Sequence, residues 1–253
     1  MMKVYLGFDD SDTPDSLYGT GKLARWFQHD MPQGCQCIGV VRQQLLVCDE
    51  ISYTSHNSSA CFIAELAEPD LLSETIERAA KHLQRYAMDG SDPGLCVAAE
   101  CDPSAERLID FGHFCTRAVA TQKQALAAAK NVHLSGHGGT NDGIIGAAAA
   151  VGLTIYGWSG RFIEFGNLRD LPDQVSVCEL NSMGIKVVSA DRDAAVPAPN
   201  DAVLTNGWLR PRLLGNLPVL LVSLQENGQW QNIYRKRRKI NDHSKTIAQP
   251  GHT

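Results

Sequence analysis

Four aspartates within seven residues are the feature of this sequence best suited to chemistry. The stretch YLGFDDSDTPDSLYGTG begins as a short apolar strand and then places Asp9, Asp10, Asp12 and Asp15 close together. Like charges at this spacing repel one another, and a hard cation such as Mg²⁺, which takes oxygen ligands and bridges to phosphate, would offset that repulsion. The preceding strand and the following glycines favour a metal–phosphate site. The alternative is a solvated turn in which Asp and Ser bond to nearby backbone.

The segment GTGKL follows the acidic cluster and has part of the pattern of a phosphate-binding loop. It is not a P-loop, because Ser16 and Leu23 stand where that motif has glycine and Ser or Thr. A glycine-flanked helix start still exposes backbone N–H groups that favour an anion. We therefore expect Gly19 and Gly21 to lie near a nucleotide, with the Thr20 hydroxyl facing the acidic cluster.

A second glycine-rich segment, GHGGTNDGIIGAAAAVG at residues 136–152, has the order strand, glycine loop, helix. This order is typical of a phosphate cradle, because small residues let the backbone approach a ligand and the helix start supplies partial positive charge. It is not the dinucleotide fingerprint, whose third glycine would fall at Asn141. The alternative is a turn before a small-residue packing helix. The candidate nucleotide-binding residues in this segment are Gly136, Gly138, Gly139, Asn141 and Asp142.

Two further polar segments have two interpretations each. TSHNSS at residues 54–59 is either a plain loop or a source of amide and hydroxyl groups for a nucleotide, with Asn57 and Ser58 as the candidates. RKRRK at residues 235–239 is either a solvated strand end or a contact to phosphate backbone.

Composition limits the class of protein. The chain has 253 residues, 43% of them hydrophobic and 20% charged, which is ordinary for a soluble globular protein. A net charge of −5 argues against a broad electrostatic grip on nucleic acid and leaves room for a local basic patch. The sequence has no apolar run long enough to span a membrane and no signal-peptide pattern, so we expect a cytoplasmic protein without membrane contact. Cys48, Cys61, Cys96 and Cys178 have strand-like contexts and are predicted to be buried, reduced thiols, without a structural zinc site.

The spacing of apolar residues predicts a mixture of strands and helices, hence an α+β or α/β class. Asp70 is the expected N-cap of a clear amphipathic helix. Other helices are expected over residues 18–30, over residues 104–130 with an interruption at Gly112, and over residues 144–151. Strands are expected over residues 3–8, 38–48, 60–67, 95–99, 132–135, 175–180, 185–190, 218–224 and 230–235, and a hairpin over residues 154–165.

These segments occur in the order seen in a known family. The chain resembles the kinase-like and ferredoxin-like part of the archaeal isoleucine-tRNA agmatinylcytidine synthetase. The words GFDDSDT at residues 7–13 and GTGKLA at residues 19–24 match the family's first block, and residues 136–152 match its later glycine-rich stretch. A strand around Pro218-Val219-Leu220 is a third match.

The resemblance implies an ATP-dependent enzyme in which a threonine of the first helix turn is phosphorylated and a cytidine carbonyl is activated for attack by agmatine. Thr20 would be the phosphorylated residue, with Asp9, Asp10 and Asp12 as the metal and phosphate group. Residues 136–142 would line the nucleotide site. The spacer before Thr20 is one residue longer than in the family, and glycines flank Thr20 where the family has a cysteine and a second threonine.

We therefore expect an α+β protein with a kinase-like α/β unit (residues 1–66 and 133–190), an interleaved ferredoxin-like unit (67–132 and 191–240) and a flexible tail (241–253). The expected function is Mg²⁺- and ATP-dependent phosphoryl transfer or ligation onto an unknown small or nucleoside-like acceptor. Family members continue into an OB-fold and a zinc ribbon that engage tRNA, and zinc-ribbon cysteines are missing here, so tRNA is a less favoured partner. A nucleotide sensor and an RNA-associated accessory protein without turnover are the alternatives.

Overall fold

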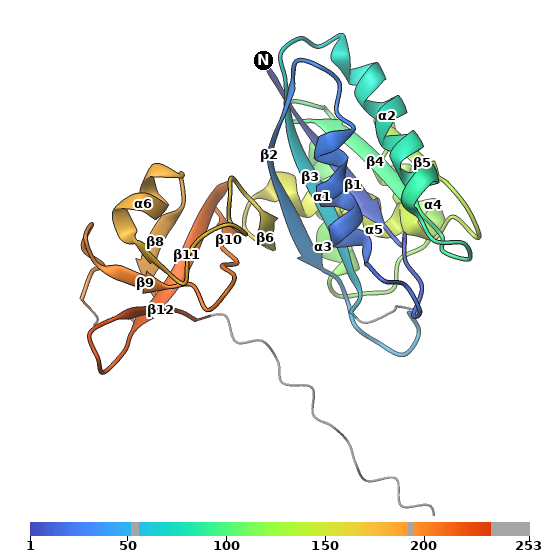
Figure 1. The fold of residues 1–253 in the computed structure, drawn as a ribbon. Coiled ribbons are helices and arrows are strands. Elements are labelled where there is room, and N and C mark those ends of the chain that lie inside the picture. Colours follow the sequence, from blue (N-terminus) through green and yellow to red (C-terminus); the bar gives the residue numbers. More distant parts are fainter. Residues whose placement is uncertain (52–55, 192–194, 234–253) are drawn as a thin grey trace, which may run out of the picture.

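The computed structural model describes residues 1–51, 56–191 and 195–233, which form two lobes joined by a continuous sheet (Figure 1). The strand order across both lobes is β5-β4-β1-β3-β2-β6-β10-β11-β12-β9-β7, and β8 pairs with β11 beside this path. The first lobe contains β1 (Met2–Asp9), α1 (Thr20–Trp26), the 3-10 helix η1 (Phe27–His29), β2 (Cys35–Gln44), β3 (Ser58–Leu66), α2 (Leu71–Tyr86), β4 (Gly94–Ala99), α3 (Ala105–Cys115), α4 (Gln122–Ala128), β5 (His133–Gly136) and α5 (Gly143–Tyr156).

The first lobe is a three-layer arrangement around β1. Strand β1 pairs antiparallel with both β3 and β4, so it lies inside the sheet and its side chains are buried on both faces. Helices α1 and α2 cover one face, and α3 and α5 cover the other (Figure 1). Helix α5 is rich in alanine and glycine and almost wholly buried, because small side chains let it lie directly against β1 and β4.

The second lobe continues the sheet from β6, and one short helix packs on it. Its core includes Trp230, which is 2% exposed, and is continuous with the core on the α5 side of the first lobe. The elements are β6 (Arg161–Glu164), β7 (Gln174–Ser176), α6 (Val177–Ser182), β8 (Lys186–Ser189), β9 (Ala202–Leu204), β10 (Arg212–Leu214), β11 (Leu217–Leu224) and β12 (Trp230–Asn232).

The topology bears on the expected division into two units. Strand β4, from the segment 67–132, pairs with β1 and β5 from the segments 1–66 and 133–190, so these three segments share one sheet. The mixed α+β class is confirmed, and the assignment of kinase-like and ferredoxin-like units stays a prediction. The expected flexible tail lies outside the described residues.

Two predictions near glycines, one of a helix break and one of a hairpin, were wrong. Helix α3 continues through Gly112, and the break falls between α3 and α4. The glycine allows α3 to pack closely on α5, because a Cβ at this position would lie 2.8 Å from Leu153 Cγ. The predicted hairpin over residues 154–165 is the end of α5 followed by β6. Gly157 ends α5 in the left-handed conformation, with φ of 77°.

Other boundaries also differ from the sequence pattern. Residues 175–180 form a strand only as far as Ser176, whose side chain then accepts a hydrogen bond from the backbone N–H of Glu179 and caps α6. Asp70 precedes α2 without a capping hydrogen bond from its side chain. Cys61 and Cys96 are buried as predicted, whereas Cys178 is exposed because it lies on α6 rather than in a strand. In the described part of the chain, no helix has the length and apolar character needed to cross a membrane.

Candidate functional site: an acidic cavity at the end of the central strand

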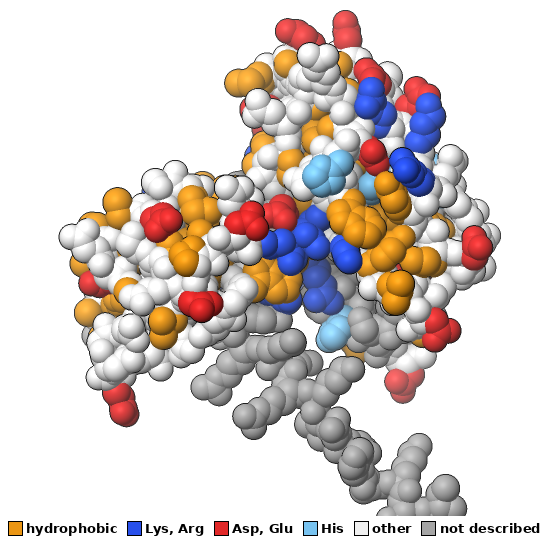
Figure 2. Space-filling view, viewed as in Figure 1, with side chains coloured by type: hydrophobic (Ala, Val, Ile, Leu, Met, Phe, Trp, Pro, Cys, Tyr) orange, Lys and Arg blue, Asp and Glu red, His pale blue; other side chains and the backbone are white. Residues whose placement is uncertain are grey.

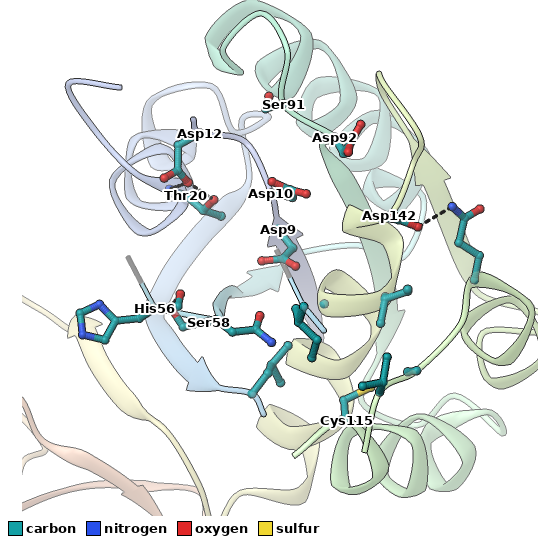
Figure 3. Close-up of a pocket in the computed structure, with 18 of the residues that line it drawn as sticks. Asp9, Asp10, Asp12, Thr20, His56, Ser58, Ser91, Asp92, Cys115 and Asp142 are labelled. Carbon is teal, nitrogen blue, oxygen red and sulfur yellow. Dashed lines mark hydrogen bonds between the residues drawn. The ribbon is translucent and has the colours of Figure 1, made fainter. Parts of the chain in front are cut away.

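A cavity of about 580 Å³ opens where β1 ends (Figure 3). One part of its wall is acidic and the other is apolar, and none of the described residues that line it is Lys or Arg. Its lining is Asp9, Asp10, Asp12, Thr13, Pro14, Thr20, Leu45, Glu50, Ile51, His56, Asn57, Ser58, Gly90, Ser91, Asp92, Cys115, Ala118, Val119, Ala120, Thr121, Gln122, Asp142, Ile145 and Gly146.

The register of the sheet explains why distant segments meet here. Asp9, the last residue of β1, lies opposite Gly94 on β4, which in turn lies opposite Gly136 on β5. The acidic cluster, the turn before β4 and the glycine-rich loop after β5 therefore share one end of the sheet. Asp10 leaves β1 with φ of +51°, a backbone conformation uncommon for a residue with a side chain and often found at functional sites.

The start of α1 is fixed to the acidic cluster through Thr20. The Thr20 backbone N–H and hydroxyl both donate to Asp12 Oδ1, at 3.0 and 2.9 Å. The Thr20 hydroxyl oxygen also accepts from the Ser11 backbone N–H at 3.2 Å and from the Ser11 hydroxyl at 3.0 Å. The predicted orientation of Thr20 toward the aspartates is therefore observed, in a side chain that is only 6% exposed.

The glycine-rich loop is held in place by two polar side chains from other segments. Asp92 accepts hydrogen bonds from the backbone N–H and the hydroxyl of Thr140, at 2.5 and 3.0 Å. Gln122, at the start of α4, donates to the Thr140 carbonyl at 2.8 Å and to Asp142 Oδ1 at 2.7 Å (Figure 3). These contacts hold Asp142 at the wall of the cavity.

The carboxylates in the cavity destabilise one another. Burial raises the pKa of Asp9 well above its usual range, and the charges of Asp10 and Asp12 raise it further. Burial and then the charges of Asp92, Asp12 and Asp142 raise the pKa of Asp10 to about 6. Burial and then the Asp9 charge raise the pKa of the Cys115 thiol to about 12, so this thiol is protonated at neutral pH.

Removing one of these charges is expected to stabilise the fold in a pH-dependent way. The pKa of Asp10 is about 6 in the folded chain, above its ordinary value of 3.8, so the folded state binds the proton more tightly and wild-type stability falls as pH rises through this window. The Asp10→Asn variant should gain about 1–2 kcal/mol at pH 7.5, after allowance for solvent screening, and little at pH 4.

Urea unfolding at the two pH values measures this difference. Asparagine adopts positive φ at least as readily as aspartate, so the substitution does not strain the backbone at this position. Asp89→Asn, at an exposed position outside the cavity, is the matched control and should change stability by less than about 0.5 kcal/mol at either pH. An equal gain for Asp10→Asn at pH 4 and 7.5 would show that charge is not the cause.

The structure brings together some of the residues singled out in the sequence and leaves others at a distance. Those that line the cavity are Asp9, Asp10, Asp12, Thr20, Asn57, Ser58 and Asp142. Gly19, Gly21, Gly136, Gly138, Gly139 and Asn141 do not line it. Within the loop, Asn141 lies against Gly136, where a Cβ would be 2.1 Å from Asn141 Oδ1. RKRRK and residues 54–55 of TSHNSS lie outside the described residues.

Sequence reasoning missed Asp92, Gln122, His56 and Cys115. The available signal for Asp92 was its place in DGSDPG, an acidic turn before the strand predicted over residues 95–99. Gln122 follows Thr121, whose capping box with Gln124 begins α4, and nothing in that pattern points to a cavity.

The donor set of the cavity suits a hard cation bound together with phosphate. Within the described residues, no group of three or more His, Cys, Asp or Glu side chains is placed to hold a metal ion by itself. Mg²⁺ is usually held by one or two carboxylates together with waters and substrate phosphates, so a complete protein cage is not required. The half-buried carboxylates of Asp9 and Asp10 are oxygen donors whose mutual repulsion such a cation would relieve.

Fold and cavity together define an α+β protein with an acidic site at the end of its central strand. Neither a protein-family model nor a curated protein matches the chain. Solved structures do match in fold. Apo TiaS, a tRNA agmatidine synthetase, is 24% identical with a TM-score of 0.50, over 60% of this chain and 35% of that one.

Two related structures give the same result. A complex of TiaS with its tRNA and ATP is 24% identical with a TM-score of 0.52, and a tRNA fluorescent labeling enzyme is 25% identical with a TM-score of 0.51. Each match covers 60% of this chain and 36% of the other, so the chain spans about a third of the length of its structural neighbours. The chain therefore has a TiaS-like fold over the matched part.

Proposed function

We propose that the acidic cavity binds ATP with Mg²⁺, and that the protein is an ATP-dependent phosphotransferase or ligase acting on a small or nucleoside-like acceptor. The observation that carries the proposal is the meeting of Asp9, Asp10, Asp12, Asp92 and Asp142 with the start of α1 in one cavity of about 580 Å³. This volume falls within the usual range for small-molecule and cofactor sites. A tetra-anionic nucleotide enters such a site only with cations that neutralise both partners.

The structural neighbours support the use of ATP. Those proteins are described as TiaS bound to a tRNA and ATP, and as TiaS bound to a tRNA, AMPCPP and agmatine. The acceptor of the present protein is not fixed by this likeness, because the shared feature is the fold. A nucleotide accompanied by a cation is the partner that we propose for the cavity.

Side chains of the cavity divide into three roles. Asp9, Asp10 and Asp12 would hold the cation, which when bound neutralises the charge of the transferring phosphate. Asn57 and Ser58, at the start of β3, would donate to the nucleotide. The apolar wall, which includes Leu45, Ile51, Val119 and Ile145, would pack against the base or the acceptor and exclude water.

Thr20 is the candidate for a phosphorylated intermediate. Its oxygen would bond to the γ-phosphorus while the bond between that phosphorus and the ADP oxygen breaks. The hydroxyl proton would pass to Asp12 Oδ1, which already accepts the hydrogen bond at 2.9 Å. Because two Ser11 groups donate to the same oxygen, one of them must move before a lone pair is available for attack.

Turnover of ATP tests the proposal. We expect the purified chain to release ADP or AMP in the presence of Mg²⁺, with loss of activity when EDTA removes the metal. Asp10→Ala should lower turnover by about 100-fold or more, because a positioned charge is difficult to replace. Asp89→Ala, an exposed residue that does not line the cavity, is the matched control.

The outcomes separate the candidate functions. Unchanged turnover in Asp10→Ala would remove the cavity as the catalytic site. Saturable ATP binding that requires Asp10, without product and without labelled protein, would identify a nucleotide sensor in place of an enzyme. The released nucleotide shows which phosphate bond is broken.

A further inference from the structure

Arginine side chains gather on the α1 face of the sheet at the junction of the two lobes. Arg42 on β2 lies directly opposite Arg161 on β6, and Arg161 lies directly opposite Arg212 on β10. Residues that oppose each other across strands project to the same face with Cβ atoms about 5 Å apart. Three arginines therefore project to the same face from neighbouring positions on three adjacent strands, and we call them the arginine row.

A second group of arginines surrounds Trp208 beside this row. Arg25 and Arg169 approach Glu164 at 3.6 and 3.5 Å. The guanidinium carbons of Arg169 and Arg210 lie 4.2 and 3.6 Å from the centroid of the Trp208 ring. Burial lowers the pKa of Arg169, and the charges of Arg25 and Arg210 lower it further while Glu164 opposes them. Two of these arginines therefore share Glu164, and two lie over the Trp208 ring.

The arginine row reaches the rim of the acidic cavity. Arg42 Nε donates to Ser58 Oγ at 2.8 Å, and Ser58 lines that cavity. Figure 2 shows Lys and Arg side chains gathered between the lobes, with acidic side chains beside them. A local basic surface of this kind is compatible with the net charge of −5.

We propose that this arginine surface, made by Arg25, Arg42, Arg161, Arg169, Arg210 and Arg212, binds a ligand carrying several phosphate groups that lies across β2, β6 and β10 with one end at the cavity rim. Guanidinium groups are suited to phosphate because they bind it in a bidentate manner, and stacking on Trp208 holds two of them in fixed orientations. A row across three strands is longer than one phosphate. The surface is separate from the proposed ATP site, so it goes beyond the proposed function.

Fluorescence anisotropy with a labelled single-stranded oligonucleotide of twelve nucleotides tests this inference, with tripolyphosphate and polyglutamate as competitors. The variant is Arg169→Gln/Arg212→Gln, which removes one exposed arginine from each group. Lys186→Gln, exposed on β8 of the same lobe, is the matched control for loss of charge. Thermal unfolding followed by circular dichroism verifies that each variant folds.

We expect wild-type binding to weaken with salt, and the double variant to bind about tenfold or more weakly with a salt slope reduced by about 0.7 per lost phosphate contact. Lys186→Gln should stay within about twofold of wild type. Competition by tripolyphosphate would show that a small polyphosphate is sufficient. Binding of the oligonucleotide without such competition would show that the phosphates must belong to a strand. Both results support the inference.

Four results would overturn it. They are absence of salt-dependent binding, unchanged affinity in the double variant, equal competition by polyglutamate, and loss of binding only when residues 235–239 are changed to glutamine. If the arginines served only to join the two lobes, the double variant would have a lower melting temperature and unchanged affinity for the oligonucleotide. Asp10→Ala separates the two proposals, because it should abolish ATP turnover and leave oligonucleotide binding intact.

Discussion

Replacing Gly7 by alanine is expected to destabilise the fold by about 3 kcal/mol or more. Gly7 is on the central strand β1, and a Cβ there would lie 2.0 Å from the Ala147 carbonyl oxygen and 2.9 Å from Val151 Cγ2. Both neighbours belong to α5, whose backbone is close-packed against the sheet. Relief of the overlap requires movement of a buried helix, which repacks the whole α5 face.

Urea unfolding gives the free energy for this comparison, with Gly138→Ala as the control. A Cβ at Gly138 would have Pro93 Cδ as its nearest neighbour, at 3.4 Å, which is ordinary van der Waals contact. Its stability should therefore change by less than about 1 kcal/mol. If Gly7→Ala proves insoluble, Gly152→Ala tests the same helix, because a Cβ there would lie 1.8 Å from the Leu108 carbonyl oxygen. Two variants of near wild-type stability would contradict the close approach of α5.

Glycine spacing shows how far sequence reasoning reaches in this chain. The glycines of residues 136–152 were given two interpretations, a phosphate cradle and a packing helix, and local sequence does not separate them. The structure shows packing at Gly143 and Gly152, where a Cβ would lie 2.2 Å from the Asp92 carbonyl oxygen and 1.8 Å from that of Leu108. Contacts of this kind depend on which strand or helix lies opposite, and a single sequence does not contain that information.

The candidate site was predictable where neighbouring residues supply it. Asp9, Asp10 and Asp12 lie within four residues, and Thr20 follows them after a short connection. A single segment of the sequence therefore indicates both the carboxylates and the start of the helix. Asp92 and Gln122 reach the same cavity from the turn before β4 and from α4. Their approach depends on the pairing of β1 with β4 and of β4 with β5, which no periodicity specifies.

Secondary structure in the second lobe was harder to predict because its strands are short. The prediction of a strand over residues 175–180 used a run of apolar residues, and such runs fit a strand or a buried helix equally well. In the structure Ser176 caps α6, so the residues that follow it form a helix. The arginine row could not be predicted from the sequence, because Arg42, Arg161 and Arg212 are far apart in the chain and become neighbours only through strand pairing. The same reason applies to the place of Asp92 in the cavity.

Thr20 is expected to carry all of the phosphate that the protein retains after incubation with Mg²⁺ and γ-labelled ATP. Thr20→Val should abolish the label, and it should also lower stability by about 1–3 kcal/mol because Asp12 and the Ser11 backbone N–H lose their partner. Thr20→Ser retains the hydroxyl and should retain the label. Thr75→Val is the matched control, because Thr75 is also buried and also donates its hydroxyl proton, to the Leu71 carbonyl at 2.7 Å.

A change at Asp12 separates chemistry from folding in this experiment. Asp12→Asn keeps an oxygen that accepts from the Thr20 backbone N–H, but it removes the carboxylate that would take the hydroxyl proton. The rate of labelling should therefore fall by about 100-fold or more while the melting temperature changes little. If wild type turns over ATP and no label appears on Thr20, the hydroxyl serves only to fix the start of α1. The acceptor must then attack the nucleotide directly, and the hydrogen bonds of Ser11 to Thr20 need not open during the reaction.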